Sequence, residues 1–306
     1  MRTDWDGHPA RSRKYFIQKM EIVKTTARLA EVTKAARNEG KSVGLVPTMG
    51  ALHQGHASLV RRARQDNDVV VVSVFVNPTQ FNNAEDLRTY PRTVDRDCAL
   101  LERLGADYAF VPTPEEVYPE PDTRVFDLGE VAAVMEGPRR PGHFNGVAQI
   151  VSRLFEWAHP TRAYFGEKDF QQIAVIRRMV AIEGGFGGLE IVACPIVREA
   201  DGLALSSRNV RLNASERAIA PTIHKVMEQS LQWAKTLSVD EVIARVTETL
   251  NATDHLQVEY YSIVDPLTMQ PVKQWNEAHN PVGCITVYCG EVRLIDNIAY
   301  PDSLHQ

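Results

Sequence analysis

The chain has 306 residues and a formal net charge of −5; 44% of its residues are hydrophobic and 24% are charged. This composition is typical of a globular protein, and it lacks the bulk positive charge that favours binding to nucleic acid or to an anionic membrane. The longest apolar run, residues 69–76, is much shorter than the ~20 residues that a membrane-spanning helix needs. The four cysteines form no CxxC pair, so we expect reduced thiols in a cytoplasmic protein.

The predicted elements begin after an unusual N-terminal stretch. Residues 1–19 combine Arg, Lys, Asp and Pro without an apolar core, which excludes a secretory signal and predicts a loosely ordered extension. From residue 20 onward, segments with the periods of strands and helices alternate. Strands are expected to begin at Glu21 and to cover residues 42–46, 69–76, 108–113, 162–166 and 189–197. Helices are expected at residues 25–38, 56–68, 98–107, 144–159 and 170–182.

The strand at residues 69–76, VVVVSVFV, is a continuous apolar run of the kind found in strands buried on both faces. It follows a strand and a helix within about 35 residues, so the three elements form a βαβ unit with parallel strands. The continuing alternation predicts a doubly wound, Rossmann-like α/β domain over residues 20–195. In such sheets, ligands bind beyond the carboxyl ends of the strands, where the strand order reverses.

After residue 195 the pattern changes to two helices followed by three strands. The helices are expected at residues 215–235 and 238–250, and the strands at 256–265, 283–289 and 291–299. Ser238 and Glu241 have the spacing of a capping box, and Gly290 suits a hairpin turn. We therefore expect a smaller α+β domain over residues 196–306. The glycine-rich segment 183–190 precedes a strand, the wrong order for a phosphate loop, and is interpreted as a connector.

The loop PTMGALHQGH, residues 47–56, contains His53 and His56 with Gly55 between them. Surface or helix-capping histidines are one interpretation. A zinc site is another, but the loop lacks the glutamate and the i, i+4 spacing of a metal-binding helix. A phosphate site explains more features, because the loop leads from a parallel strand into a helix whose free N–H groups favour anions. Gly55 would let a phosphate approach the backbone.

Two further loops supply cations to the same region. Lys168 lies in the segment GEKD, which follows a strand and precedes a helix, so it should lie at the sheet edge that carries the two histidines. Ser206, Ser207 and Arg208 open the second domain, and two hydroxyls with a guanidinium suit a mobile phosphate clamp. Ordinary polar turns are the alternative interpretation of both loops.

Amide side chains follow the same strand ends. Asn77 and Gln80 follow the strand expected at residues 69–76, and Gln171 and Gln172 lie at the start of the helix after GEKD. These amides suit a hydroxyl or carboxylate group of a small substrate, and at least one of the two helix glutamines should face the same crevice. Buried structural amides are the alternative.

Six segments, in this order and at family spacing, resemble the pantothenate synthetase family: PTMGALHQGH, FVNPTQF, EDLRTYPRT, RPGHFNGV, YFGEKDFQQ and READGLALSSRN. The resemblance covers nearly all of the chain from residue 20 onward. It implies that the carboxylate of pantoate attacks the α-phosphorus of ATP, giving pantoyl adenylate and pyrophosphate. The amine of β-alanine would then attack the acyl carbon and release pantothenate and AMP. The resemblance also implies Mg²⁺ bound with the ATP phosphates, and a homodimer.

The same resemblance implies roles for individual residues. Those that would act on the reacting phosphates are His53, His56, Lys168, Ser206, Ser207 and Arg208. The remaining residues implied for ATP are Pro47, Thr48, Met49, Gly55, Gly166 and Asp169, with Asp169 on the ribose. Those implied for pantoate are Gln80, Gln172, Met49, Asn77 and Arg140, and Asp97 would lie near the magnesium–phosphate group. The chain departs from the family at Leu205 and Thr79, where methionine is frequent.

Other functions stay open on the residues alone. A nucleotidylyltransferase would share the histidines and the clamp, but it needs further cations for a phosphorylated acceptor, whereas Gln80 and Gln172 suit a hydroxy acid. A non-catalytic nucleotide-binding regulator does not need the clamp at residues 206–208. A tRNA synthetase is disfavoured, because the net charge is −5 and no basic RNA-binding domain is evident.

Overall fold

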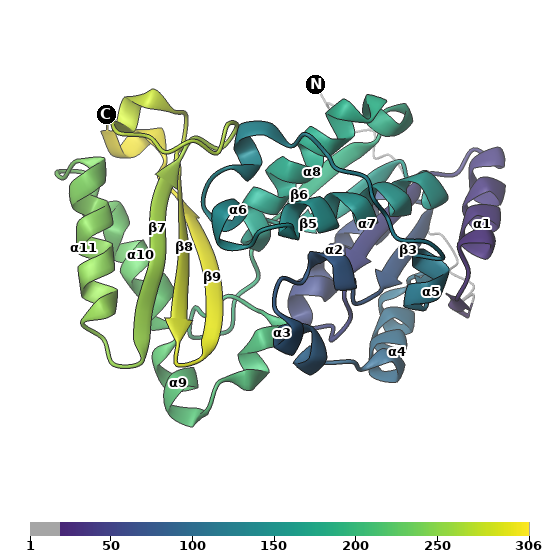
Figure 1. The fold of residues 1–306 in the computed structure, drawn as a ribbon, viewed down its shortest axis with the longest axis horizontal. Helices are drawn as coiled ribbons and strands as arrows, with labels where there is room; N and C mark the ends of the chain where they lie inside the picture. Colours follow the sequence, from purple (N-terminus) through teal and green to yellow (C-terminus); the bar gives the residue numbers. More distant parts are fainter. Residues whose placement is uncertain (1–18, 306) are drawn as a thin grey trace, which may run out of the picture.

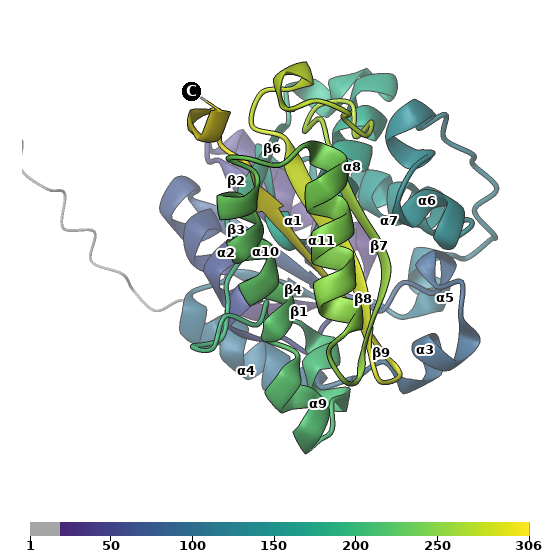
Figure 2. The same cartoon turned by 90° about the vertical axis from the view of Figure 1, so that its left-hand side faces the viewer.

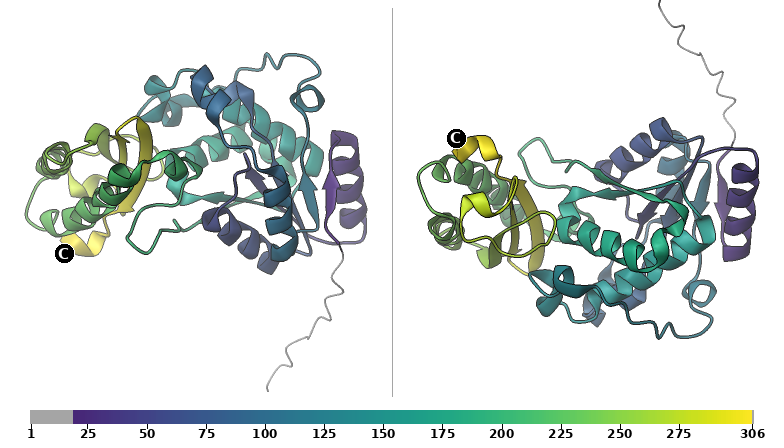
Figure 3. Two further views of the ribbon diagram at one scale, coloured as in Figure 1. Left: turned by 90° about the horizontal axis from the view of Figure 1, so that it is seen from below. Right: turned by 90° about the horizontal axis from the view of Figure 1, so that it is seen from above.

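The structure is a computed structural model that describes residues 19–305. A parallel sheet and a smaller antiparallel sheet lie beside each other along the long axis of the molecule (Figures 1 and 3). The extension expected at residues 1–19 lies, apart from Lys19, outside the described residues. No helix in the described part of the chain has the length and apolar character needed to cross a membrane.

The parallel sheet has the strand order β1-β4-β3-β2-β5-β6. Its strands are β1 (Glu21–Val23), β2 (Val43–Thr48), β3 (Val69–Val74), β4 (Tyr108–Phe110), β5 (Arg162–Gly166) and β6 (Glu190–Cys194). Every neighbouring pair is parallel, which confirms the predicted α/β fold. From β2 the chain proceeds through β3 and β4 on one side and β5 and β6 on the other. The order therefore reverses between β2 and β5, and ligands are expected beyond the ends of these two strands.

Helices cover both faces of this sheet (Figure 1). One face carries α1 (Thr26–Asn38), α7 (His143–Ala158) and α8 (Phe170–Ile182), and the other carries α2 (Gln54–Asp66) and α4 (Val94–Leu104). The short helices α3 (Ala84–Thr89), α5 (Pro114–Val117) and α6 (Glu136–Arg139) lie in the connections and were not predicted. The glycine-rich segment 183–190 connects α8 to β6, as expected.

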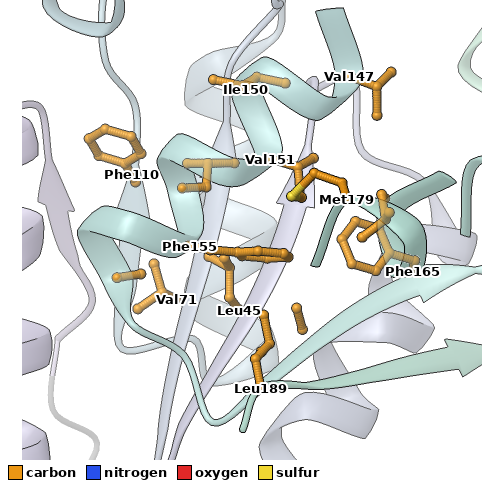
Figure 4. Packing of buried hydrophobic residues seen from close by; sticks show 14 of the residues in the cluster. Leu45, Val71, Phe110, Val147, Ile150, Val151, Phe155, Phe165, Met179 and Leu189 are labelled. Carbon is orange, nitrogen blue, oxygen red and sulfur yellow. The ribbon is translucent and has the colours of Figure 1, made fainter. Parts of the chain in front are cut away.

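Strand β3 shows why its sequence is a continuous run of valines. Val69 and Val71 belong to the core on the α7 side, while Val70 and Val72 belong to the core on the α2 side. All four are buried, because successive side chains of a strand point to opposite faces and helices cover both. Figure 4 shows Val71 in the first of these cores, beside Leu45 and Phe155.

The C-terminal part consists of helices and an antiparallel sheet. Its elements are α9 (Ala214–Ile219), α10 (Thr222–Trp233), α11 (Val239–Asn251), β7 (Leu256–Val264), β8 (Val282–Cys289) and β9 (Val292–Ala299). Helices α10 and α11 pack on one face of the sheet (Figure 2). The predicted capping box at Ser238 and the hairpin at Gly290 are both present. The single helix expected at 215–235 is instead divided into α9 and α10 near Pro221, because proline has no N–H to continue the hydrogen-bond ladder.

Candidate active site

A cavity of about 210 Å³ lies at the reversal point between β2 and β5. Its walls come from the loops that follow β2, β3, β5 and β6 and from one side of α7. Predicted site residues that line it are Pro47, Thr48, Met49, His53, Gly55, His56, Asn77, Gln80, Gly166, Lys168, Asp169, Gln172, Ser206, Ser207 and Arg208. Arg140 and Asp97 are the two predicted residues that do not line it. The structure thus collects in one place residues as far apart in the sequence as Pro47 and Arg208, a separation of roughly half the chain length.

The two histidines form a capping box at the start of α2. His53 is the N-cap residue, and its Nδ1 accepts a hydrogen bond from the backbone N–H of Gly55 at 3.1 Å. Nδ1 of His56 accepts from the backbone N–H of His53 at 3.3 Å. A ring nitrogen that accepts carries no proton, so in each neutral ring the proton is on Nε2. The histidines therefore cap the helix and also hold a defined Nε2–H donor. The capping and phosphate-binding interpretations are compatible.

Both rings are neutral at pH 7. Burial and the neighbouring Lys168 ammonium lower the pKa of His53 to about 4. Burial, His53 and Lys168 lower the pKa of His56 to about 3. A neutral donor suits this position, because it stabilises growing phosphate charge without the cost of burying another cation beside Lys168.

These pKa values predict that the ligand-free protein loses stability in mild acid. Between pH 6.5 and about 4, the unfolded histidines bind protons that the folded ones do not, so the free energy of unfolding falls as the pH is lowered. The expected loss at pH 5 is roughly 2 kcal/mol per ring. Chemical denaturation at pH 7.5 and pH 5 measures it. The variant His53→Asn keeps a capping acceptor without titrating, and should lose less. Equal stability at both pH values in the unmodified protein would contradict this assignment.

The cations of the cavity differ in their pairing. In the part of the chain that the structure describes, the nearest carboxylate oxygen to Nζ of Lys168 belongs to Asp169, at 4.0 Å, and the Lys168 side chain is 17% exposed. Arg208, by contrast, pairs at 2.8 Å with Asp86 on α3, which also holds Arg211 at 2.9 Å. Lys168 is therefore the cation better able to meet an incoming phosphate directly, whereas Arg208 must exchange its carboxylate partner.

Two residues that contact the clamp loop had not been singled out. Asp86 receives Arg208 and Arg211, and the hydroxyl of Tyr90 lies 3.1 Å from Oγ of Ser207. Tyr90 also lines the cavity. Both belong to the segment EDLRTYPRT. The acidic pair Glu85 and Asp86 in the first turn of α3 was the available signal, but it resembles an ordinary helix N-terminus.

The predicted amides are arranged around Gln80. Asn77 is buried, and its Nδ2 donates to Oε1 of Gln80 at 3.2 Å, while Nε2 of Gln80 donates to Sδ of Met49 at 3.0 Å. Of the two helix glutamines, Gln172 lines the cavity. Gln171 instead bonds the backbone around α6, so it is a structural amide.

The family model described as "Pantoate-beta-alanine ligase" matches residues 21–299. The chain belongs to the pantoate–β-alanine ligase family. The pantothenate synthetase of Porphyromonas gingivalis is 60% identical over 283 residues, covering 92% of this chain and 100% of that protein. The pantothenate synthetase of Bacteroides fragilis is 57% identical, covering 93% of this chain and 100% of the relative.

Solved structures of the family have the same fold. The crystal structure of pantothenate synthetase from Thermus thermophilus matches with a TM-score of 0.85 and 45% identity, covering 92% of this chain and 100% of that one. The ligase from Francisella tularensis, described as complexed with "Beta-gamma ATP and Beta-alanine", matches with a TM-score of 0.77 and 34% identity, covering 92% and 98% of the two chains. This family membership agrees with the resemblance of the six sequence segments.

The structure does not support the role that the resemblance implied for Asp97. It was expected near a magnesium–phosphate group, but it is buried and does not line the cavity. Its carboxylate accepts the backbone N–H groups of Ala51 and Leu52 at 2.9 and 2.8 Å and the hydroxyl of Thr93. Asp97 therefore fixes the loop that carries the histidines.

The change Asp97→Asn is expected to destabilise the protein by roughly 1–3 kcal/mol, because an amide group would point a donor at one of two backbone N–H groups. Thermal unfolding measures this effect. Asp95→Asn is the matched control, because Asp95 is exposed in the same helical turn and should be nearly neutral. Similar stability of the two variants would contradict the structural role.

Arg140 lies beside the cavity rather than in its wall. Its Nη1 is 3.0 Å from Nε2 of His143 and 3.7 Å from Oε2 of Glu136. It lines two neighbouring cavities, which also include Lys168 and Asp169. Direct contact with pantoate is thus less well supported by the geometry than it is for Gln80 and Gln172.

Proposed function

We propose that this chain condenses pantoate with β-alanine at the expense of ATP, giving pantothenate, AMP and pyrophosphate through a pantoyl-adenylate intermediate. The observation that carries the proposal is the single cavity that combines Lys168, two neutral Nε2–H donors and the amides Gln80 and Gln172. Cationic and N–H groups suit a polyphosphate, and the amides suit a small hydroxy acid. Membership of the pantoate–β-alanine ligase family supports the same substrates.

In the first step, a carboxylate oxygen of pantoate attacks the α-phosphorus of ATP. A new P–O bond forms, the bond to the β-phosphate oxygen breaks, and pyrophosphate leaves with that electron pair. Negative charge grows on the phosphoryl oxygens, where His53, His56 and Lys168 can stabilise it. Preorganised donors of this kind cost no reorganisation at the moment of reaction.

In the second step, the amine of β-alanine attacks the acyl carbon of the intermediate. The acyl C–O bond breaks, AMP leaves with the bridging oxygen, and the nitrogen loses a proton as the amide forms. The protein's contribution is chiefly positioning: Gln80 and Gln172 hold the pantoyl part, while the phosphate contacts hold the AMP part.

The remaining contacts follow from position. We assign the ribose to Asp169 and the walls of the ATP and pantoate sites to the Pro47–Thr48 backbone, Met49, Gly55 and Gly166. Ser206, Ser207 and Arg208 are assigned to the ATP phosphates. Because they belong to the C-terminal part, we propose that residues 196–306 form a lid domain over residues 20–195. Exchange of Arg208 from Asp86 to phosphate would accompany its closure.

Mg²⁺ is proposed to accompany ATP and to neutralise part of its phosphate charge. Among the described residues, Asp169 is the one carboxylate that lines the cavity, and residues 19–305 contain no group of three or more His, Cys, Asp or Glu side chains arranged to hold a metal. This fits an ion held mainly by nucleotide oxygens and water, as Mg²⁺ often is. A homodimer in the cytoplasm is the proposed state of the protein, on the strength of the family resemblance.

The test is an incubation of the purified protein with ATP, Mg²⁺, pantoate and β-alanine, followed by quantification of AMP, pyrophosphate and pantothenate. We expect equal amounts of all three, and none when pantoate is omitted. AMP production that does not depend on pantoate, or transfer of AMP to a phosphorylated acceptor instead, would refute the ligase assignment.

A further inference from the structure

His143, the first residue of α7, has both ring nitrogens engaged although no role had been assigned to it. The side chain is buried, with 6% of the residue exposed. Its Nδ1 lies 2.8 Å from the backbone oxygen of Gln80, and its Nε2 lies 3.0 Å from Nη1 of Arg140. The ring therefore lies between a loop residue of the cavity and a cation outside it.

The partners of His143 determine where its proton lies. A backbone carbonyl can only accept, so Nδ1 must carry the hydrogen, while arginine can only donate, so Nε2 must be bare. Burial and the Arg140 guanidinium lower the pKa of His143 to about 4, which keeps the ring in this neutral form. The tautomer is the opposite of the one in His53 and His56.

The loop that His143 holds is packed tightly on α7. A Cβ atom on Gly146 would lie 2.3 Å from the backbone oxygen of Thr79, so glycine is needed for this close approach. Nδ2 of Asn77 also donates to the backbone oxygen of Gly146 at 3.1 Å. The backbone of Gln80 is thus fixed against the first turns of α7, while its side chain reaches the cavity.

On its other side, His143 is connected to the C-terminal sheet. Arg140 lies 3.7 Å from Glu136. Glu136 in turn accepts hydrogen bonds from Tyr260 on β7 and Arg293 on β9, at 2.8 Å in each case. His143 is therefore the member of this polar chain that contacts Gln80, in the loop after β3.

We propose that His143 is a positioning residue for the acid substrate: its Nδ1–H holds the carbonyl of Gln80 and so aims the Gln80 amide at pantoate. The inference rests on the proposed function, because that function assigns Gln80 to pantoate. His143 itself touches neither substrate.

Two variants distinguish the role of Nδ1 from that of Nε2. The amide nitrogen of asparagine can occupy the place of Nδ1, whereas that of glutamine extends to the place of Nε2. His143→Gln is expected to raise the KM for pantoate about tenfold, with the KM for ATP and kcat within about threefold of wild type. His143→Asn should restore the KM for pantoate to within about threefold. His224→Gln, at a half-buried histidine of the C-terminal part, should leave both KM values unchanged.

A double-mutant cycle tests the route through Gln80. In a Gln80→Ala background, His143→Gln should cause no further rise in the KM for pantoate, because the side chain that it positions has gone. A purely structural role would lower the melting temperature and would raise both KM values in either background. That result, or equal pantoate KM values for the asparagine and glutamine variants, would overturn the proposal.

The wild-type protein gives a test that does not depend on folding of the variants. Two-dimensional ¹H–¹⁵N spectra of its imidazoles should show His143 protonated at Nδ1 alone, unchanged from pH 8 to pH 6. A proton on Nε2 would overturn the proposal. If the wild-type protein itself releases no pantoate-dependent AMP, the proposed function fails instead, whichever tautomer is found.

Discussion

Replacement of Lys168 by methionine is expected to lower the rate of pantoate-dependent pyrophosphate release by roughly 100- to 1,000-fold. Methionine keeps most of the aliphatic length but removes the ammonium from the cavity. Within residues 19–305, Lys168 has no carboxylate partner closer than the 4.0 Å contact to Asp169. The charge of Lys168 is thus available for phosphate. Loss of this charge should reduce stabilisation of the transition state more than it reduces the stability of the fold. Single-turnover measurements with saturating ATP and pantoate give the rate.

The control for this change is Lys34→Met, at an exposed position on α1, a helix that contributes no residue to the cavity wall. It should leave the rate unchanged, and both variants should unfold within a few degrees of the wild type. A Lys168→Met rate within threefold of the control would remove Lys168 from the chemical step.

Replacement of His53 separates its two functions. In His53→Asn the side-chain oxygen can still cap α2, but the Nε2–H donor is lost, so we expect a roughly 100-fold lower rate with little change in stability. In His53→Gln a donor can still reach the place of Nε2, but the cap is lost. That variant should lose roughly 1 kcal/mol of stability and retain more activity.

The measurements for these variants are single-turnover adenylate formation and chemical denaturation at pH 7.5. The asparagine variant should have the lower rate of the two, and the glutamine variant should have the lower stability. If glutamine proves more damaging to the rate and asparagine more damaging to stability, then the assignment of the His53 proton to Nε2 is wrong.

The strands of the parallel sheet and the long helices that cover it could be predicted because burial in the core requires apolar side chains at regular positions. The valines of β3 are apolar at every position since helices cover both faces, and α7 is apolar along one side since it packs on the sheet. The short helices α3, α5 and α6 carry no such periodicity. The single helix predicted over residues 215–235 ran across Pro221, although a proline in a helical pattern is a local signal for a break.

The candidate site could be predicted to the extent that it follows strand ends. The loops after β2, β3 and β5 meet because parallel strands end at one edge, so His53, Gln80 and Lys168 are neighbours by topology. Pairings across the fold had no comparable signal. Nothing near Asp97 indicates that its partners are backbone groups more than forty residues earlier, and nothing near Asp86 indicates an arginine of the C-terminal part.

Oxygen-isotope transfer tests the adenylate mechanism most directly. With pantoate carrying ¹⁸O at both carboxylate oxygens, one labelled oxygen should become the bridge to the α-phosphorus and remain on AMP when the acyl C–O bond breaks. Mass spectrometry should therefore find one ¹⁸O in AMP and one in pantothenate. Unlabelled AMP, or label in orthophosphate or pyrophosphate, would contradict attack of the pantoate carboxylate on the α-phosphorus in this cavity.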